Sequence, residues 1–121
     1  MKDLIDVAGA SGAVYRFARL RDGRPLSAMG GNYVYTRESG EAPEIVFAGV
    51  AQNLLTDAHE RWDEAVRAHD AAQLFTRLNV SQSVRQHEQE DILEACRPPM
   101  NGPADADPTG PSPAVDARPA P

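Results

Sequence analysis

The sequence predicts a small domain of the α/β (α+β) class, with an antiparallel sheet of three or four short strands flanked by helices. Stretches rich in aromatic and β-branched residues are separated by Gly, Pro and Asp turns, and stretches with apolar residues at every third or fourth position alternate with them. Eight of the ten prolines lie between Pro98 and Pro121, so about 100 residues remain to fold. This length excludes a Rossmann or TIM-barrel enzyme.

Residues 1–29 are expected to form an N-terminal extension. Residues 3–8 predict a short helix that ends at the glycine-rich turn of residues 9–12. Residues 13–20 predict a strand, because they carry aromatic and β-branched side chains and precede the turn dipeptide Asp22-Gly23.

Residues 30–101 form the predicted main domain, and they open with a hairpin. Residues 32–36 and 45–49 are both dense in β-forming residues, and a polar turn joins them. Side chains alternate across a strand, so Tyr33 and Tyr35 are expected on the same face of the sheet.

Helical spacing begins after Asn53, a predicted N-cap, and fades near Asp70, which predicts a helix or a helix pair with Trp62 in the core. Residues 74–80 return to strand composition. A last helix is expected to start at Ser81 or at Ser83, which forms a capping box with Gln86, and to run to Cys96 before Pro98-Pro99 stops it.

Residues 102–121 read as a disordered tail, because Val115 is their single β-branched aliphatic residue and they hold no aromatic side chain. The start of the chain has no apolar run of signal-peptide type and no stretch is long enough to span a membrane. One cysteine and three scattered histidines exclude an internal disulfide and a Cys-rich zinc site. A reduced, cytoplasmic setting is therefore expected.

Charge is unevenly distributed along the chain. The 12 basic and 18 acidic residues give a net charge of −6, which disfavours a generic nucleic-acid coat. Residues 12–40 carry five arginines against two acids, whereas residues 41–70 carry seven acids against two arginines. The acidic residues fall mainly on the predicted helix that follows the hairpin.

Three short blocks occur in order: Gly31-Asn32-Tyr33, then Phe47-Ala48-Gly49, and finally Glu90-Asp91-Ile92-Leu93 followed by Arg97-Pro98-Pro99-Met100-Asn101. Together they resemble the GIY-YIG nuclease superfamily over residues 30–101. The resemblance implies a three-stranded antiparallel sheet flanked by helices. It also implies phosphodiester hydrolysis that uses a carboxylate-held divalent metal, an arginine for the phosphate and a tyrosine hydroxyl.

The family positions are only partly matched. Tyr33 corresponds to the first family tyrosine and Asn101 to the closing asparagine. Phe47 stands at the second tyrosine and lacks the hydroxyl, Asp57 stands at the arginine, and Gln89 stands at the metal-binding glutamate. A carboxamide is a poorer ligand for a hard cation than a carboxylate. Arg61, one turn after Asp57, and Glu88, beside Gln89, are near-equivalents that could restore a phosphate clamp and a metal ligand.

The sequence thus predicts a degenerate, non-catalytic domain that binds nucleic acid or a protein through the former active-site face around Tyr33. One alternative is an active endonuclease that uses Mg²⁺ or Mn²⁺ at a rearranged site of Tyr33, Arg61, Glu88 and Asn101; otherwise no cofactor is expected. Another is an adaptor that recruits a protein through its acidic helix or its tail. Five arginines are candidates for a DNA-facing patch: Arg16, Arg19, Arg21, Arg24 and Arg37.

Overall fold

The computed structural model describes residues 3–21 and 25–101. Their strands form one antiparallel sheet in the order β1-β2-β5-β3-β4. The elements in chain order are β1 (Leu4–Ala8), β2 (Val14–Arg19), β3 (Gly31–Ser39), β4 (Ala42–Ala51), α1 (Leu54–Asp57), α2 (Trp62–His69), β5 (Gln73–Leu78), α3 (Gln82–Cys96) and the 3₁₀ turn η1 (Pro99–Asn101). The α+β class predicted from the sequence is confirmed.

The sheet has five strands where three or four were expected, because the predicted helix at residues 3–8 is wrong. Residues 4–8 form β1, which pairs with β2 along its whole length. Burial alternates: Val7 is buried and Ile5 half-buried, while their neighbours are exposed. A short apolar run fits a helix or a strand, and here the β-branched residues and the pairing with β2 decide.

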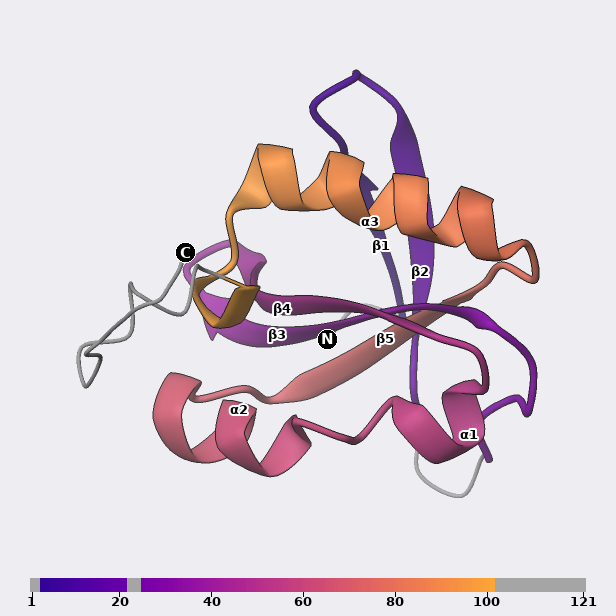
Figure 1. The fold of residues 1–121 in the computed structure, drawn as a ribbon. Coiled ribbons are helices and arrows are strands. Elements are labelled where there is room, and N and C mark those ends of the chain that lie inside the picture. The colour runs from indigo at the N-terminus through magenta and orange to yellow at the C-terminus, as the bar shows by residue number, and fades with distance from the viewer. Residues whose placement is uncertain (1–2, 22–24, 102–121) are drawn as a thin grey trace, which may run out of the picture.

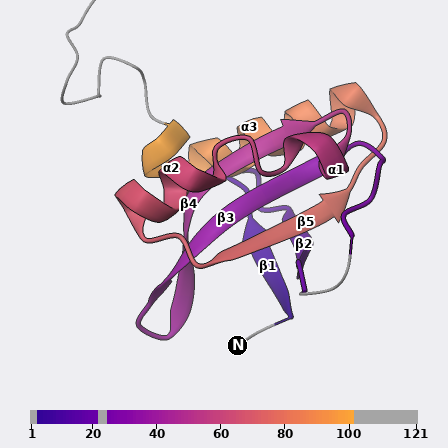
Figure 2. The same cartoon turned by 90° about the horizontal axis from the view of Figure 1, so that it is seen from below.

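The helices cover opposite faces of the sheet (Figures 1 and 2). The α1–α2 segment lies on one face, and α3 lies across the other. Tyr33 and Tyr35 are buried in the core on the α1–α2 side, as their spacing predicted, whereas Val34 is buried in the core on the α3 side. Trp62 packs edge-on against Tyr35, with ring centroids 5.2 Å apart.

The helix boundaries follow the predicted capping residues. Asn53 caps α1 by accepting a hydrogen bond from the Thr56 amide. Residues 58–61 separate α1 from α2, so the acidic segment is a helix pair. Ser81, and not Ser83, caps α3, and its hydroxyl accepts from the Val84 amide. At the far end, Arg97 adopts a left-handed conformation and ends α3 before the proline pair.

The sheet curls at the junction of β2 and β5. Only two residue pairs, Ala18 with Thr76 and Arg19 with Phe75, join these strands, whereas β3 pairs with β5 through six. Figure 2 shows β1 and β2 at a steep angle to β3 and β5. The tail predicted at residues 102–121 lies outside the described residues. In the described part of the chain, no helix is long and apolar enough to cross a membrane.

Candidate functional site

The candidate site is built on the central strand β3 and the edge strand β4, on the side that faces α1 and α2. Tyr33 lies opposite Gly49, and Tyr35 lies opposite Phe47. Ring centroids of Tyr33 and Phe47 are 5.8 Å apart. A Cβ atom at residue 49 would lie 2.5 Å from Cζ of Tyr33. The glycine of the second motif is therefore required by the tyrosine of the first, whose ring lies over its backbone.

The Tyr33 hydroxyl is held in its protonated form. The residue is only 1% exposed, and its hydroxyl donates to the Glu60 carboxylate over 3.3 Å. Burial, with the nearby Tyr35 and Glu60, raises the pKa of Tyr33 above its ordinary value. A tyrosine that accepts a proton from water needs its pKa lowered by positive charge. The surroundings of Tyr33 instead raise its pKa.

Tyr35, which was not predicted to be a site residue, makes the stronger contacts. Its hydroxyl donates to the Ala58 carbonyl over 2.7 Å and accepts from the Arg61 amide over 3.2 Å. Burial raises the pKa of Tyr35 to about 12. The residue is fully buried and satisfies two backbone groups in the link between α1 and α2. No residue motif predicts this contact, because it depends on where that link crosses the sheet.

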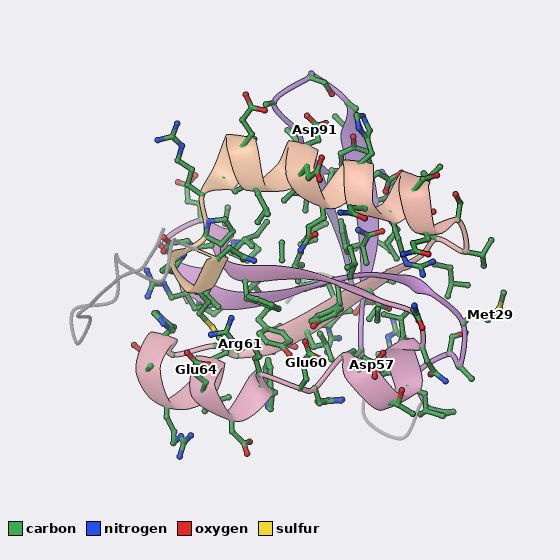
Figure 3. The ribbon with its side chains drawn as sticks, in the orientation of Figure 1. Met29, Asp57, Glu60, Arg61, Glu64 and Asp91 are labelled. Atoms are coloured by element: carbon green, nitrogen blue, oxygen red, sulfur yellow. The ribbon has the colours of Figure 1, made fainter. Side chains whose placement is uncertain are left out.

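Arg61 lies at the site and is engaged by neighbouring groups. Its guanidinium lies over the Phe47 ring, 5.1 Å from the centroid. It donates to the Met100 carbonyl over 3.2 Å and to the Glu64 carboxylate over 2.8 Å. Asp57 accepts from the Thr56 hydroxyl. Figure 3 shows Asp57, Glu60 and Glu64 on the same α1–α2 side of the sheet as Arg61, and Glu64 is the carboxylate that pairs with it.

Gln89 and Asn101 converge on the backbone of one residue, Ala48, at the outer edge of β4. The Asn101 side chain accepts from the Ala48 amide over 2.7 Å and donates to the Ala48 carbonyl over 2.9 Å. Gln89 donates to the same carbonyl over 3.0 Å. The Asn101 carboxamide therefore bonds to β4 as the backbone of an opposite residue on a neighbouring strand would. Gln89 and Asn101 thus both satisfy the backbone of an edge strand.

Glu88 lies on the other face of the sheet from Tyr33. Its carboxylate pairs with Arg77 of β5 over 2.9 Å, and the Arg77 guanidinium lies over the Tyr15 ring. Among the described residues, no group of three His, Cys, Asp or Glu side chains could hold a metal ion together. Since Gln89 directs an amide N–H at a carbonyl and Glu88 binds an arginine, the residues at these positions do not fit Mg²⁺ or Mn²⁺.

The described arginines of the predicted DNA-facing patch each contact a carboxylate. Arg16 pairs with Asp6, Arg19 and Arg21 both pair with Asp3, and Arg37 pairs with Glu44. These contacts raise the pKa of Arg16 and Arg37 and lower that of Asp3. Arg24 lies outside the described residues.

A second polar cluster, on the α3 side, joins the turn after β1 to α3. The Asp91 carboxylate accepts from the Ser11 hydroxyl over 2.6 Å, from the Ser11 amide over 2.8 Å and from the Tyr15 hydroxyl over 2.7 Å. These hydrogen bonds lower the pKa of Asp91, and the bond from the Ser11 hydroxyl has the largest effect on it. Figure 3 shows Asp91 on the side of the sheet away from Arg61. The cluster fixes the hairpin of β1 and β2 to α3.

Four of the positions taken from the resemblance, with Arg61 as the near-equivalent of the fifth, therefore lie around β4 in two groups. Tyr33, Phe47 and Arg61 pack together under α1–α2, and Gln89 and Asn101 meet at Ala48 on the edge. Comparison of the chain with protein-family models, with curated proteins and with solved structures finds no match.

Proposed function

We propose that this chain is a non-catalytic, nuclease-like domain that binds a protein partner through the α1–α2 face around Tyr33. The observation that carries the proposal is the use of Gln89 and Asn101 as hydrogen-bonding partners of Ala48. A residue that bonds to the backbone in this way is not available to bind a metal or a phosphate. Both side chains serve the fold by satisfying the Ala48 backbone.

The charges around Tyr33 also favour binding over phosphodiester cleavage. Cleavage needs a cation beside the phosphate and a base for the nucleophile. Arg61 is shared between Glu64 and a backbone carbonyl, and the Tyr33 hydroxyl faces Glu60. Carboxylates at this position repel a phosphodiester.

A partner with a basic surface fits this face better than nucleic acid does. The α1–α2 segment exposes Glu60, Asp63 and Glu64, and Asp57 is partly exposed beside them. The arginines that would contact DNA are paired with Asp3, Asp6 and Glu44 instead. Complementary charge steers and selects a protein partner.

Incubation with branched, single-stranded and duplex DNA in the presence of Mg²⁺ or Mn²⁺ tests the loss of catalysis. We expect no cleavage by the full chain. Cleavage that Tyr33→Phe abolishes would contradict the proposal and support the rearranged endonuclease of Tyr33, Arg61, Glu88 and Asn101.

Binding is tested with a fluorescent Lys/Arg-rich peptide and, separately, with labelled duplex DNA. Two variants carry the same charge change: Glu60→Lys/Asp63→Lys on the α1–α2 face, and Glu90→Lys/Glu94→Lys on exposed positions of α3. We expect the first pair to weaken peptide binding about tenfold more than the second. Equal effects would overturn the assigned face. Salt-sensitive DNA binding that Arg19→Ala weakens would favour nucleic acid as the ligand.

A further inference from the structure

Arg85, in the first turn of α3, is a buried cation with no carboxylate bonded to it. The residue is only 6% exposed. Its Nη1 atom donates to the Asn79 carbonyl over 3.2 Å and to the Val80 carbonyl over 3.0 Å. None of the ion pairs among the described residues includes Arg85, and Glu88, one turn further along α3, binds Arg77 instead. Burial of a charge without a counter-charge is costly.

The unused atoms of Arg85 are those that bind a carboxylate elsewhere in this protein. In a guanidinium, Nε and Nη2 form a fork that matches the geometry of a carboxylate. Arg77 binds Glu88 through these two atoms. In Arg85 neither atom has a partner in the described part of the chain. Thr36 Oγ1 is the one fully enclosed side-chain polar atom there without a partner, so the fork of Arg85 reaches the surface.

The guanidinium of Arg85 is held in place by the surrounding backbone. A Cβ atom at residue 30 would lie 2.7 Å from Nη1 of Arg85, so the glycine at this position lets the side chain lie against the chain. The Asn79 amide donates to the Gly30 carbonyl, and the Asn32 side chain donates to the Arg85 carbonyl over 2.8 Å. A cation fixed in this way loses little further freedom when it binds a ligand.

The first turn of α3 adds to the positive potential around Arg85. The helix has 15 residues, and its first turn holds no acidic side chain. Ser81 accepts from the Val84 and Arg85 amides, whereas the Gln82 and Ser83 amides have no partner among the described residues. Open N–H groups and aligned peptide dipoles at a helix N-terminus favour an anion. The guanidinium lies at this end, because it bonds to the residues before the cap.

Exposed apolar side chains flank the residues that hold Arg85. Val80, which accepts from the guanidinium, Val84, which precedes Arg85, and Met29, which precedes Gly30, are between 46% and 64% exposed. Figure 3 shows Met29 at the end of the molecule where α3 begins. Arginine and methionine beside exposed apolar side chains are typical of the centres of protein interfaces.

One cation among apolar side chains suits a peptide carboxylate better than nucleic acid. Nucleic acid presents phosphates in a row and is bound by several Lys or Arg side chains together. Arg77, the other arginine in contact with α3 residues of this half of the helix, is neutralised by Glu88. A carboxylate flanked by apolar side chains would fill the fork of Arg85 and cover the exposed valines beside it.

We propose that Arg85 and the first turn of α3 bind a side-chain carboxylate of a protein partner, in a segment where an Asp or Glu is flanked by apolar residues. The carboxylate occupies the fork of Nε and Nη2, and its apolar neighbours contact Met29, Val80 and Val84. This acidic segment is distinct from the basic surface proposed for the α1–α2 face, because complementary charge selects the opposite sign at each place.

Two immobilised peptide libraries test the proposal on the full chain. In the first, one Asp is flanked by varied apolar residues, and in the second, Asn replaces the Asp. We expect the Asp peptides to bind about tenfold more tightly than their Asn counterparts. Addition of a bound Asp peptide should shift the Nε–H signal of Arg85 in NMR spectra and leave that of Arg77 unchanged. Equal binding of the two libraries, or binding of neither, would overturn the proposal.

Two valine variants test the location of the site. Val84→Glu adds a carboxylate beside Arg85 and should weaken binding of the Asp peptides about tenfold. The helix is expected to form, because an acidic side chain near its N-terminus is favourable. Val14→Glu, the matched control, makes the same change at an exposed valine of β2 and should bind as wild type does. Equal effects of the two variants would contradict the assigned site.

A third variant and two other ligands distinguish the remaining occupants. Arg85→Gln removes the cation and keeps an amide that can donate to a carbonyl, so it should abolish the preference for Asp over Asn. Binding of labelled duplex DNA in place of the Asp peptides, weakened by Val84→Glu, would overturn the proposal in favour of phosphate. Self-association of the chain that Val84→Glu abolishes would instead identify a second copy as the occupant.

Discussion

Gln89, which stands where the resemblance implies a metal-binding glutamate, is matched to the group it contacts. Its amide donates to the Ala48 carbonyl over 3.0 Å, whereas a glutamate at this position would place a carboxylate against that carbonyl. We predict that Gln89→Glu lowers the free energy of unfolding by about 1–3 kcal/mol at neutral pH. Chemical denaturation measures this, with the exposed Gln86→Glu as a control of equal charge.

The cost of Gln89→Glu should depend on pH with a definite sign. The carbonyl raises the pKa of the introduced carboxyl in the folded state, so the penalty is absent below its unfolded pKa of about 4.3 and appears as pH rises through that value. A cost that is the same at pH 3 and pH 7 would contradict the predicted contact.

The two tyrosines of β3 should respond differently to loss of the hydroxyl. Tyr35 bonds to the Ala58 carbonyl and the Arg61 amide inside the protein, and Tyr33 makes one long bond to Glu60. We predict that Tyr35→Phe costs about 1–3 kcal/mol of unfolding free energy and Tyr33→Phe less than about 1 kcal/mol. Denaturant unfolding of the pair measures the difference, and the reverse order would show that Tyr33 carries the structural contact.

Among single residues, the resemblance identified positions that lie together but did not identify their roles. Asn101 could be located from the proline pair, yet its bond to Ala48 exists because β4 is an edge strand. Edge position is a property of sheet order, which pattern and spacing do not specify. Tyr35 was missed because its partners belong to the link between α1 and α2, and residue spacing does not specify where that link lies.

At the scale of elements, Asp91 connects the turn after β1 to α3, and this connection should be lost in acid. Hydrogen bonds from Ser11 and Tyr15 lower the pKa of Asp91 below its ordinary value of 3.8. A lowered folded pKa gives stability that is present above the unfolded pKa and is lost as pH falls through the folded one.

We predict that Asp91→Asn destabilises the protein at pH 7 and flattens the fall in stability below about pH 4. Unfolding curves measured between pH 2.5 and pH 7 test this, with the exposed neighbour Glu90→Gln as the control. If wild type and Asp91→Asn lose stability in parallel, the carboxylate is not the source of the acid sensitivity.

Most helices and strands were predicted correctly from the sequence, and one was not. Strand composition identified β2, β3, β4 and β5, and capping residues identified the starts of α1 and α3. The wrong assignment of residues 3–8 had a further effect, because Asp3 and Asp6 were then not expected beside β2. In the structure they pair with Arg16, Arg19 and Arg21. Because β1 was assigned as a helix, the ion pairs of Arg16, Arg19 and Arg21 were not predicted.

For the whole molecule, the uneven pairing of the sheet predicts uneven stability. The β3 strand pairs with both neighbours along most of its length, whereas β2 joins β5 through two residue pairs. We predict that amides of β3 and β5 exchange most slowly and that the hairpin of β1 and β2 opens at lower free energy. Native-state hydrogen exchange in low denaturant measures this, and one common opening energy for all strands would contradict it.

The fold class was predictable because it depends on the alternation and helical spacing of some 70 residues, and single errors do not change it. The curl of the sheet was not predictable, because it depends on how far β2 and β5 overlap. A cavity lined by residues of β1, β4 and α3 follows from that curl.

The contact of Asn101 with Ala48 has a consequence for concentrated solutions. An outer strand with open backbone groups is a template on which another molecule can grow a shared sheet. The Asn101 carboxamide occupies both the backbone N–H and the backbone C=O of Ala48 in β4. A strand from another molecule would therefore meet an interruption there, and its pairing with β4 would be limited to the residues on either side of Ala48.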